Sequence, residues 1–154
     1  MNRGRLILGV VLLAAVACDS EPSGPEDACM LVDLPLSGGA SGPTIVDVGL
    51  EVQEGSGIVV VATATDPQGT ADLEDVIQSV GVFRSDGCEG APIVLQDDLV
   101  GSGVEETFGT AVEASTDPAL YGTIAAAASW PVEIAFSDKS GNRTSGRVSA
   151  RVFR

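Results

Sequence analysis

Apolar and polar side chains alternate along most of the chain from about residue 44 onward, which is the pattern of β-strands that bury one face. The first alternating segment has four apolar residues on one face, namely Val46, Val48, Leu50 and Val52. These side chains are expected to point into a core. The next segment, residues 58–65, carries β-branched residues on both faces and is expected to be a central strand.

Five further segments show strand patterns: residues 76–84, 92–96, 104–112, 132–137 and 147–153. The expected inward residues of the last two are Val132, Ile134 and Phe136, and Val148, Ala150 and Val152. About seven short strands separated by turn residues predict an all-β fold, an antiparallel β-sandwich.

One helix interrupts the strands. Thr116-Asp117-Pro118 has the character of a helix start with proline at the first helical position, and the alanines up to Ala128 can continue it. We expect a short helix packed across the end of the sandwich.

The last two strands are expected to form a hairpin. Lys139-Ser140-Gly141 suits a three-residue loop with Gly141 in the left-handed region. This register pairs Val132 with Val148 on the inside and Glu133 with Arg147 on the outside.

Two segments resemble the second and the last strand regions of bacterial Ig-like domains: residues 59–69 (VVVATATDPQG) and 132–142 (VEIAFSDKSGN). The resemblance implies an Ig-like sandwich over roughly residues 44–154, with adhesive or spacer roles. The helical insertion, and a cysteine pair that starts outside the sandwich, depart from that pattern.

The first residues resemble a lipoprotein signal. Arg3 and Arg5 precede an apolar run, residues 6–17, whose length as a helix is about 18 Å, too short for a hydrocarbon core of about 30 Å. The run ends in Leu-Ala-Ala-Val-Ala-Cys18, which resembles the bacterial lipobox and implies that Cys18 is lipidated. An ordinary signal that is cleaved after Ala-Val-Ala, leaving Cys18 as a free thiol, is the alternative.

The chain is therefore expected to comprise a signal peptide (1–17), Cys18 with a flexible tether (18–28) and one Ig-like domain (29–154). The tether, rich in acidic residues, proline and serine, is expected to be disordered. A lipidated Cys18 leaves Cys29 and Cys88 as an even pair in an oxidising compartment, which favours a disulfide over a metal site or a thiol nucleophile.

The net charge of the cleaved chain limits the kinds of partner that it can bind. After cleavage six basic residues remain against 22 acidic ones, a net charge of −16. Such a domain is not expected to bind nucleic acid, because that affinity depends on neutralising phosphates. The expected partners are the membrane, through the lipid, and an unidentified protein or envelope polymer. The expected location is the bacterial envelope outside the cytoplasm, with the inner or outer membrane left open.

The residues needed for most catalytic mechanisms are missing from the sequence. It contains no histidine, which excludes serine and cysteine triads and the HExxH zinc motif, and Lys139 is its only lysine. A non-enzymatic binding or structural module is therefore expected, without a cofactor. The alternative is a small carbohydrate-active or other hydrolytic domain, with paired carboxylates in a cleft beside Trp130 or Tyr121.

Two charged groups remain as candidate sites. The first could ligate Ca²⁺ at one tip of the sandwich: Asp66, Asp72, Asp75, Asp138 and Asn142, with Glu74 nearby. We favour no metal there, since Asp66 and Asp138 suit turns capped by their own side chains. The second is Arg143, Arg147 and Arg151, either a stripe for an anionic ligand or, as we favour, charge balance within an acidic domain.

Overall fold

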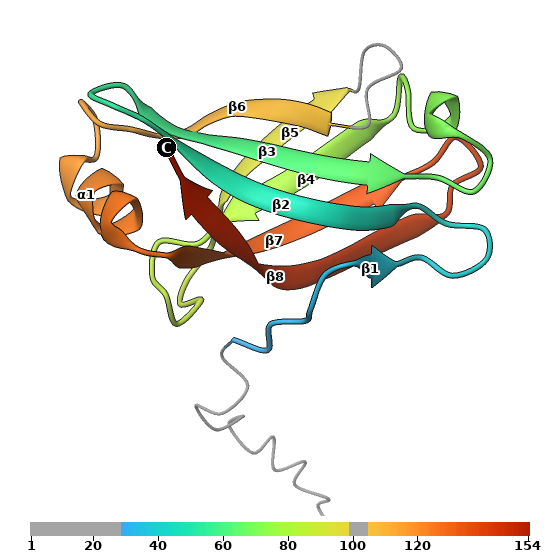
Figure 1. Cartoon of the computed structure of the whole chain (residues 1–154), viewed down its shortest axis with the longest axis horizontal. Coiled ribbons are helices and arrows are strands. Elements are labelled where there is room, and N and C mark those ends of the chain that lie inside the picture. The colour runs from blue at the N-terminus through green and yellow to red at the C-terminus, as the bar shows by residue number, and fades with distance from the viewer. Residues whose placement is uncertain (1–28, 99–104) are drawn as a thin grey trace, which may run out of the picture.

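The structure is a computed structural model that describes residues 29–98 and 105–154. The expected signal peptide, Cys18 and the tether lie outside the described residues. The elements follow one another along the chain as shown in Figure 1: β1 (Leu36–Ser37), β2 (Thr44–Gln53), β3 (Gly57–Thr65), a 3-10 helix (Thr70–Asp72), β4 (Ile77–Val82), β5 (Ile93–Asp98), β6 (Glu105–Glu113), α1 (Pro118–Ala126), β7 (Ser129–Ser137) and β8 (Arg143–Phe153).

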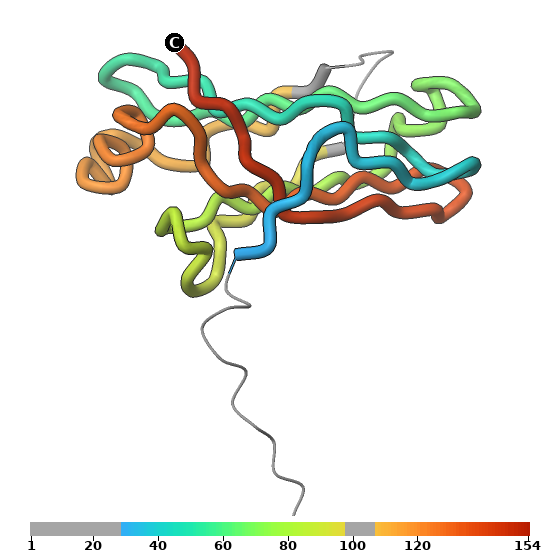
Figure 2. Tube along the Cα trace, turned by 60° about the horizontal axis from the view of Figure 1, so that its bottom comes forward, coloured from blue at the N-terminus to red at the C-terminus, as the bar shows by residue number. Residues whose placement is uncertain are grey.

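The strands form one curled sheet in the order β5-β4-β7-β8-β2-β3-β6, with β1 paired to β2. Figure 2 shows its two halves as layers around the core, with β2 and β3 facing β7 and β8. The two edge strands, β5 and β6, approach each other, so the sheet is nearly a closed barrel. The expectation of a mostly β fold with one short helix is confirmed.

One strand pair departs from the expected antiparallel pattern. Residues Gly49–Glu51 of β2 pair in parallel with Arg151–Phe153 of β8, while β2 also pairs antiparallel with β3 along its whole length. Strand β2 therefore joins the two layers.

The inward face of β2 differs from the prediction at its start. The β2–β3 register shifts between Ile45 and Asp47, a β-bulge that reverses the alternation there. As a result Ile45 is fully buried, whereas Val46 is 41% exposed. The expectation that Val46 faces the core is wrong, while Val48, Leu50 and Val52 are buried as predicted.

The final hairpin has the predicted register. Val132 pairs with Val148 and both are fully buried, whereas Glu133 pairs with Arg147 on the outer face. The turn closes through a 3.0 Å hydrogen bond from the N–H of Gly141 to the carbonyl of Asp138, and Gly141 has a φ of 87°. Strand β8 begins at Arg143, four residues earlier than the predicted 147.

Helix α1 begins where the sequence predicts and ends at Ala126, two residues before Ala128. The carboxylate of Asp117 accepts a 3.1 Å hydrogen bond from the N–H of Leu120 and caps the helix, and proline follows at the first position. Leu120 and Ile124 are buried against the core.

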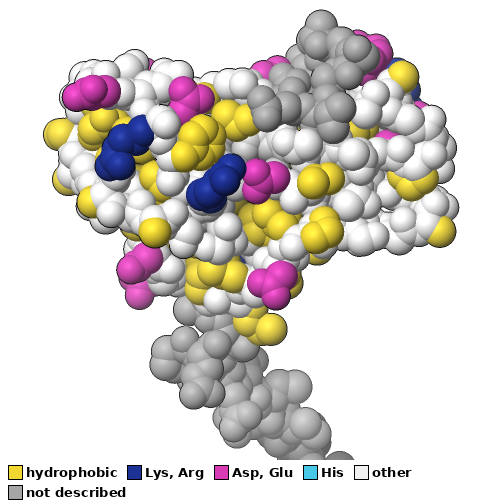
Figure 3. Space-filling view, in the orientation of Figure 1, with side chains coloured by type: hydrophobic (Ala, Val, Ile, Leu, Met, Phe, Trp, Pro, Cys, Tyr) yellow, Lys and Arg dark blue, Asp and Glu magenta, His cyan; other side chains and the backbone are white. Residues whose placement is uncertain are grey.

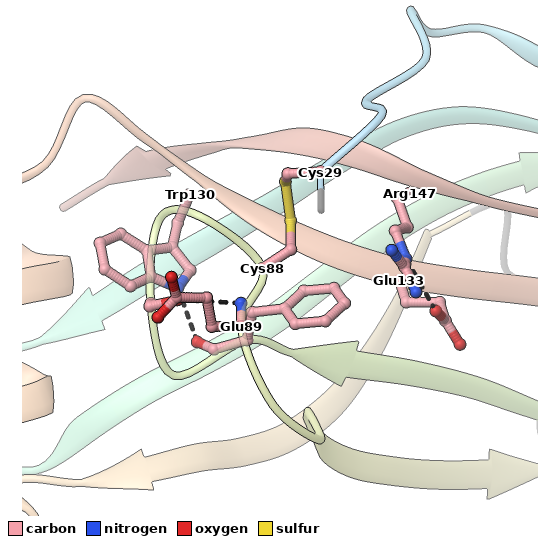
Figure 4. Close-up of a disulfide and its surroundings, with 8 residues drawn as sticks. Cys29, Cys88, Glu89, Trp130, Glu133 and Arg147 are labelled. Atoms are coloured by element: carbon pink, nitrogen blue, oxygen red, sulfur yellow. Dashed lines mark hydrogen bonds and ion pairs between the residues drawn. A yellow bond between two sulfur atoms is a disulfide. The ribbon is translucent and has the colours of Figure 1, made fainter. Parts of the chain in front are cut away.

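A disulfide joins Cys29, which precedes β1, to Cys88 in the loop between β4 and β5 (Figure 4), so the predicted pairing is confirmed. Beside it Trp130 is 4% exposed and donates a 2.8 Å hydrogen bond from its indole N–H to the carbonyl of Phe83. Trp130 is therefore a core residue at the start of β7.

Candidate functional site

A groove of about 360 Å³ crosses the outer face of the layer that contains β4, β5, β7 and β8. Its position follows from strand pairing, because residues directly opposite each other on neighbouring strands point to the same face. The lining residues are Ser79, Val80, Gly81, Val94, Glu133, Ile134, Ala135, Arg143, Ser145, Gly146 and Arg147.

Small side chains make the floor of the groove. Ser79 on β4 pairs with Ala135 on β7, which pairs with Ser145 on β8, so three small residues lie in one row across three strands. The next outward row contains Gly81 and Glu133, and Val94 extends it onto β5. The groove exists because larger residues flank a row that has almost no side-chain volume.

The groove also has apolar and polar groups at its margin. Val94 is 57% exposed at the edge of the sheet, and Ile77, two residues before Ser79 on the same face of β4, is 65% exposed. Ser79 and Ser145 offer hydroxyl groups that can donate or accept hydrogen bonds. A shallow groove with hydroxyls on its floor and exposed apolar residues beside it suits an extended ligand.

The three arginines of β8 have different surroundings. Arg147 forms a 3.3 Å ion pair with Glu133, and its guanidinium lies 5.3 Å from the ring centre of Phe83. Arg151 forms a 3.5 Å ion pair with Asp47 and lies 5.5 Å from the ring centre of Phe153. Charge balance within the acidic domain accounts for these two arginines.

Arg143 differs from the other two arginines of β8. It lines the groove and is exposed, and no carboxylate of the described residues lies within ion-pair distance of it. On the face that carries β2 and β8, basic and acidic side chains both occur among uncharged atoms (Figure 3). Arg143 therefore offers a positive charge that the domain's own acids leave available.

A second cluster lies at the end of the molecule where β3 and β7 end, on the right in Figure 1. Carboxylate oxygens of Asp66, Asp72 and Asp138 lie within 4.8 Å of one another. Asp66 follows β3, Asp72 belongs to the 3-10 helix, and Asp138 opens the β7–β8 turn. The structure thus brings together three of the five residues that the sequence offered as calcium ligands.

Asp138 has the turn-capping role that the sequence indicated. It is 3% exposed, and its two oxygens accept 2.7 Å hydrogen bonds from the backbone N–H and the side-chain amide of Asn142. Burial alone would raise the pKa of this carboxyl, but the bonds from Asn142 and from the backbones of Ser140 and Gly141 outweigh burial and lower the pKa below its usual 3.8.

The other two candidates have different places. Asp75 is exposed, has a φ of 57° and lies outside the cluster, so it is not brought to the same point. The side-chain amide of Asn142 donates a hydrogen bond to Asp138 and so orients its carboxylate. Asp66 caps its own turn, because its Oδ1 accepts a 2.8 Å hydrogen bond from the N–H of Gln68.

The carboxylates do not gather beside an aromatic ring. Trp130 and Asp138 lie at opposite ends of β7, and the hydroxyl of Tyr121 is bonded to the β2–β3 hairpin through Gln53 and Gly55. Within residues 29–98 and 105–154, therefore, the arrangement that would favour a hydrolytic site beside Trp130 or Tyr121 is not found.

Two features of the site were not predicted from the sequence. The row Ser79–Ala135–Ser145 consists of ordinary small residues whose alignment depends on the pairing of three strands. Gln78 is fully buried and joins Leu73, after the 3-10 helix, to the end of β7, and nothing in a single strand pattern distinguishes it from an outward polar residue.

Comparison of the chain with protein families, with curated proteins and with solved structures finds no match. In the part of the chain that the structure describes, no helix has the length and apolar character needed to cross a membrane. The function is therefore argued from the groove and the loops themselves.

Proposed function

We propose that the domain is an Ig-like sandwich. The support is its strand order: with β2 to β8 taken as strands A, B, C, C′, E, F and G, one layer holds A, B and E and the other holds C′, C, F and G. Ig-like domains divide their strands in a similar way, with A, B and E in one sheet and C, F and G in the other. The parallel pairing of β2 with β8 makes the two layers continuous in this chain.

We further propose that the protein is a lipoprotein anchored to the bacterial envelope through Cys18. The sequence pattern before Cys18 supports this, and the Cys29–Cys88 bond leaves Cys18 as the one cysteine of the chain that is outside the disulfide. In detergent phase partitioning the wild-type protein should enter the detergent phase and Cys18→Ser should stay aqueous. If both proteins stay aqueous, the anchor is wrong.

The function that the geometry supports best is non-enzymatic binding of a protein partner, through an extended segment laid in the groove. This function rests on the groove itself, with Arg143 at its wall in a chain that has 22 acidic residues. Charge complementarity indicates an acidic side chain of the partner at Arg143. The exposed side chains of Ile77 and Val94 provide apolar contact, and Ser79 and Ser145 provide hydrogen bonds.

Site-specific photo-crosslinking in intact cells tests this binding. A photo-reactive residue at Ser79 or Ser145 should give a protein adduct, whereas the same residue at Ser149 should not, because Ser149 is exposed on β8 but does not line the groove. Arg143→Glu should lower the yield at Ser145 about tenfold, as loss of roughly 1.4 kcal/mol of binding would.

Arg151→Glu is the matched control, since it makes the same charge change on the same strand outside the groove. Equal yields from Ser145 and Ser149, or equal losses from both charge reversals, would contradict the proposal. An adduct that resists protease but is degraded by polysaccharide hydrolases would show that the occupant is an envelope glycan instead.

A further inference from the structure

The acidic cluster at the loop end is formed by two loops that are hydrogen-bonded to each other. The backbone N–H of Lys139, in the β7–β8 turn, donates a 2.9 Å hydrogen bond to the carbonyl of Asp72. The ammonium group of Lys139 donates a 2.8 Å bond to the carbonyl of Ala71. These bonds hold the 3-10 helix Thr70–Asp72 against the turn that carries Asp138, so the three carboxylates meet at a defined position.

Two of the carboxylate oxygens in this cluster have no partner. The Oδ2 atoms of Asp66 and Asp72 are buried from solvent, and neither accepts a hydrogen bond from any group in the structure. An ionised oxygen without a donor or water costs more than a neutral one, and buried polar atoms are otherwise nearly always satisfied. Turn capping does not explain these two atoms, because in Asp66 it is the other oxygen, Oδ1, that caps the turn.

The separation of the carboxylates is short enough for all three to bind a single ion. Oxygen ligands lie about 2.3–2.6 Å from Ca²⁺, so ligands on opposite sides of the ion are at most about 4.6–5.2 Å apart. One oxygen from each of Asp66, Asp72 and Asp138 lies within 4.8 Å of the other two, which is within that limit. Mg²⁺ demands a strict octahedron and keeps most of its waters, so a set of three carboxylates from two loops favours Ca²⁺ by its chemistry.

We propose that Asp66, Asp72 and Asp138 form a Ca²⁺-binding site that joins the loop after β3 to the β7–β8 turn. The Oδ2 atoms of Asp66 and Asp72 are the new ligands, and Asp138 binds with lone pairs that its bonds from Asn142 leave free. Water completes the coordination. The ion neutralises part of a threefold negative charge and supplies the partner that the two buried oxygens lack.

The affinity should be that of an extracellular module, with Kd in the range of about 0.1–1 mM. The site has only three carboxylates and is partly open, since Asp66 and Asp72 are half-buried. At 10 mM CaCl₂ the full-length protein should therefore melt about 5–10 °C higher than in MgCl₂ at the same ionic strength. Equilibrium dialysis with calcium alone should give one ion per chain.

Charge-neutralising substitutions locate the effect. Asp66→Asn and Asp72→Asn should each remove the calcium-specific rise in melting temperature. Asp75→Asn is the matched control, because it makes the same change in the same loop at an exposed residue outside the cluster, and asparagine accepts its left-handed φ of 57°.

The proposal is overturned if Ca²⁺ and Mg²⁺ raise the melting temperature of the wild-type protein equally, since general screening would then explain the effect. It is also overturned if Asp75→Asn loses the calcium-specific rise as fully as Asp72→Asn does. The wild-type comparison stands without the variants, so a variant that fails to fold does not prevent the test.

Discussion

Replacing Gln78 by methionine should destabilise the domain by removing a side-chain link between β4 and the end of β7. Gln78 is fully buried. Its amide N–H groups donate to the carbonyls of Ser137 at 2.8 Å and Leu73 at 3.4 Å, and its Oε1 accepts a 2.6 Å bond from the N–H of Ser137. The backbone pairing of β4 with β7 ends at the pair Ser79–Ala135. Beyond that pair, the side chain of Gln78 takes the place of the backbone and holds the two strands together.

The magnitude follows from the two short bonds. Each contributes about 1 kcal/mol, and the N–H of Ser137, left without an acceptor in a partly buried position, adds about 1 kcal/mol more. Methionine has nearly the same volume as glutamine, so it creates no large cavity, and burial of its apolar chain offsets part of the loss. We therefore expect the free energy of unfolding to fall by about 2–3 kcal/mol.

Urea unfolding monitored by fluorescence of Trp130 measures this change. With an m-value of about 1–3 kcal/mol/M, the midpoint should fall by roughly 1–2 M with no change in m. Gln96→Met is the control, because Gln96 is an exposed residue on the neighbouring strand β5 and its substitution should cost less than about 0.5 kcal/mol. A loss below about 1 kcal/mol for Gln78→Met, or equal losses for both variants, would refute the link.

Two other perturbations test the covalent bridge and the turn. Replacing Cys29 and Cys88 together by serine should lower the unfolding free energy by up to about 4 kcal/mol, since the bond closes a loop of sequence separation 59. Melting in the presence and absence of reductant measures it, and an unchanged melting temperature would contradict the estimate. The lowered pKa of Asp138 means that its carboxylate stabilises the fold above about pH 4 and that this stability is lost as the pH falls through the folded-state pKa. Acid unfolding of Asp138→Asn should therefore show a weaker pH dependence below pH 4 than the wild type, and identical curves would show that the hydrogen bonds of Asp138 do not favour its charged form.

The predictable part of the fold is the part governed by local pattern. The register of the final hairpin was predicted correctly because alternation and the turn residues Lys139-Ser140-Gly141 agree with each other. The inward face at Val46 was not, because a bulge adds one residue and reverses the alternation without a marker in the sequence. The parallel pairing of β2 with β8 was also missed, since it depends on how the layers close.

The candidate sites, like the fold, have parts that the sequence predicts and parts that it does not. Cys29 and Cys88 were paired by counting cysteines, and the loops of Asp66 and Asp138 were placed together from topology alone. The turn caps of Asp66 and Asp138 were predicted, but which oxygens stay without partners depends on side-chain orientation, which the sequence does not give. The groove depends on the register of three strands at once, and no single strand contains its pattern.

The disulfide determines how the domain would carry mechanical tension. A pull on the chain before Cys29 passes directly through the two sulfur atoms to Cys88, because the bond is the first connection that it meets. Strands β1 to β4 lie between the two cysteines in the sequence, so this force bypasses them and does not peel β1 or β2 from the sheet. The load enters instead at the loop between β4 and β5, the strands that provide Ser79 and Val94 to the groove. A protein tethered at Cys18 that holds a partner in this groove would transmit tension along a covalent path to the strands in contact with that partner.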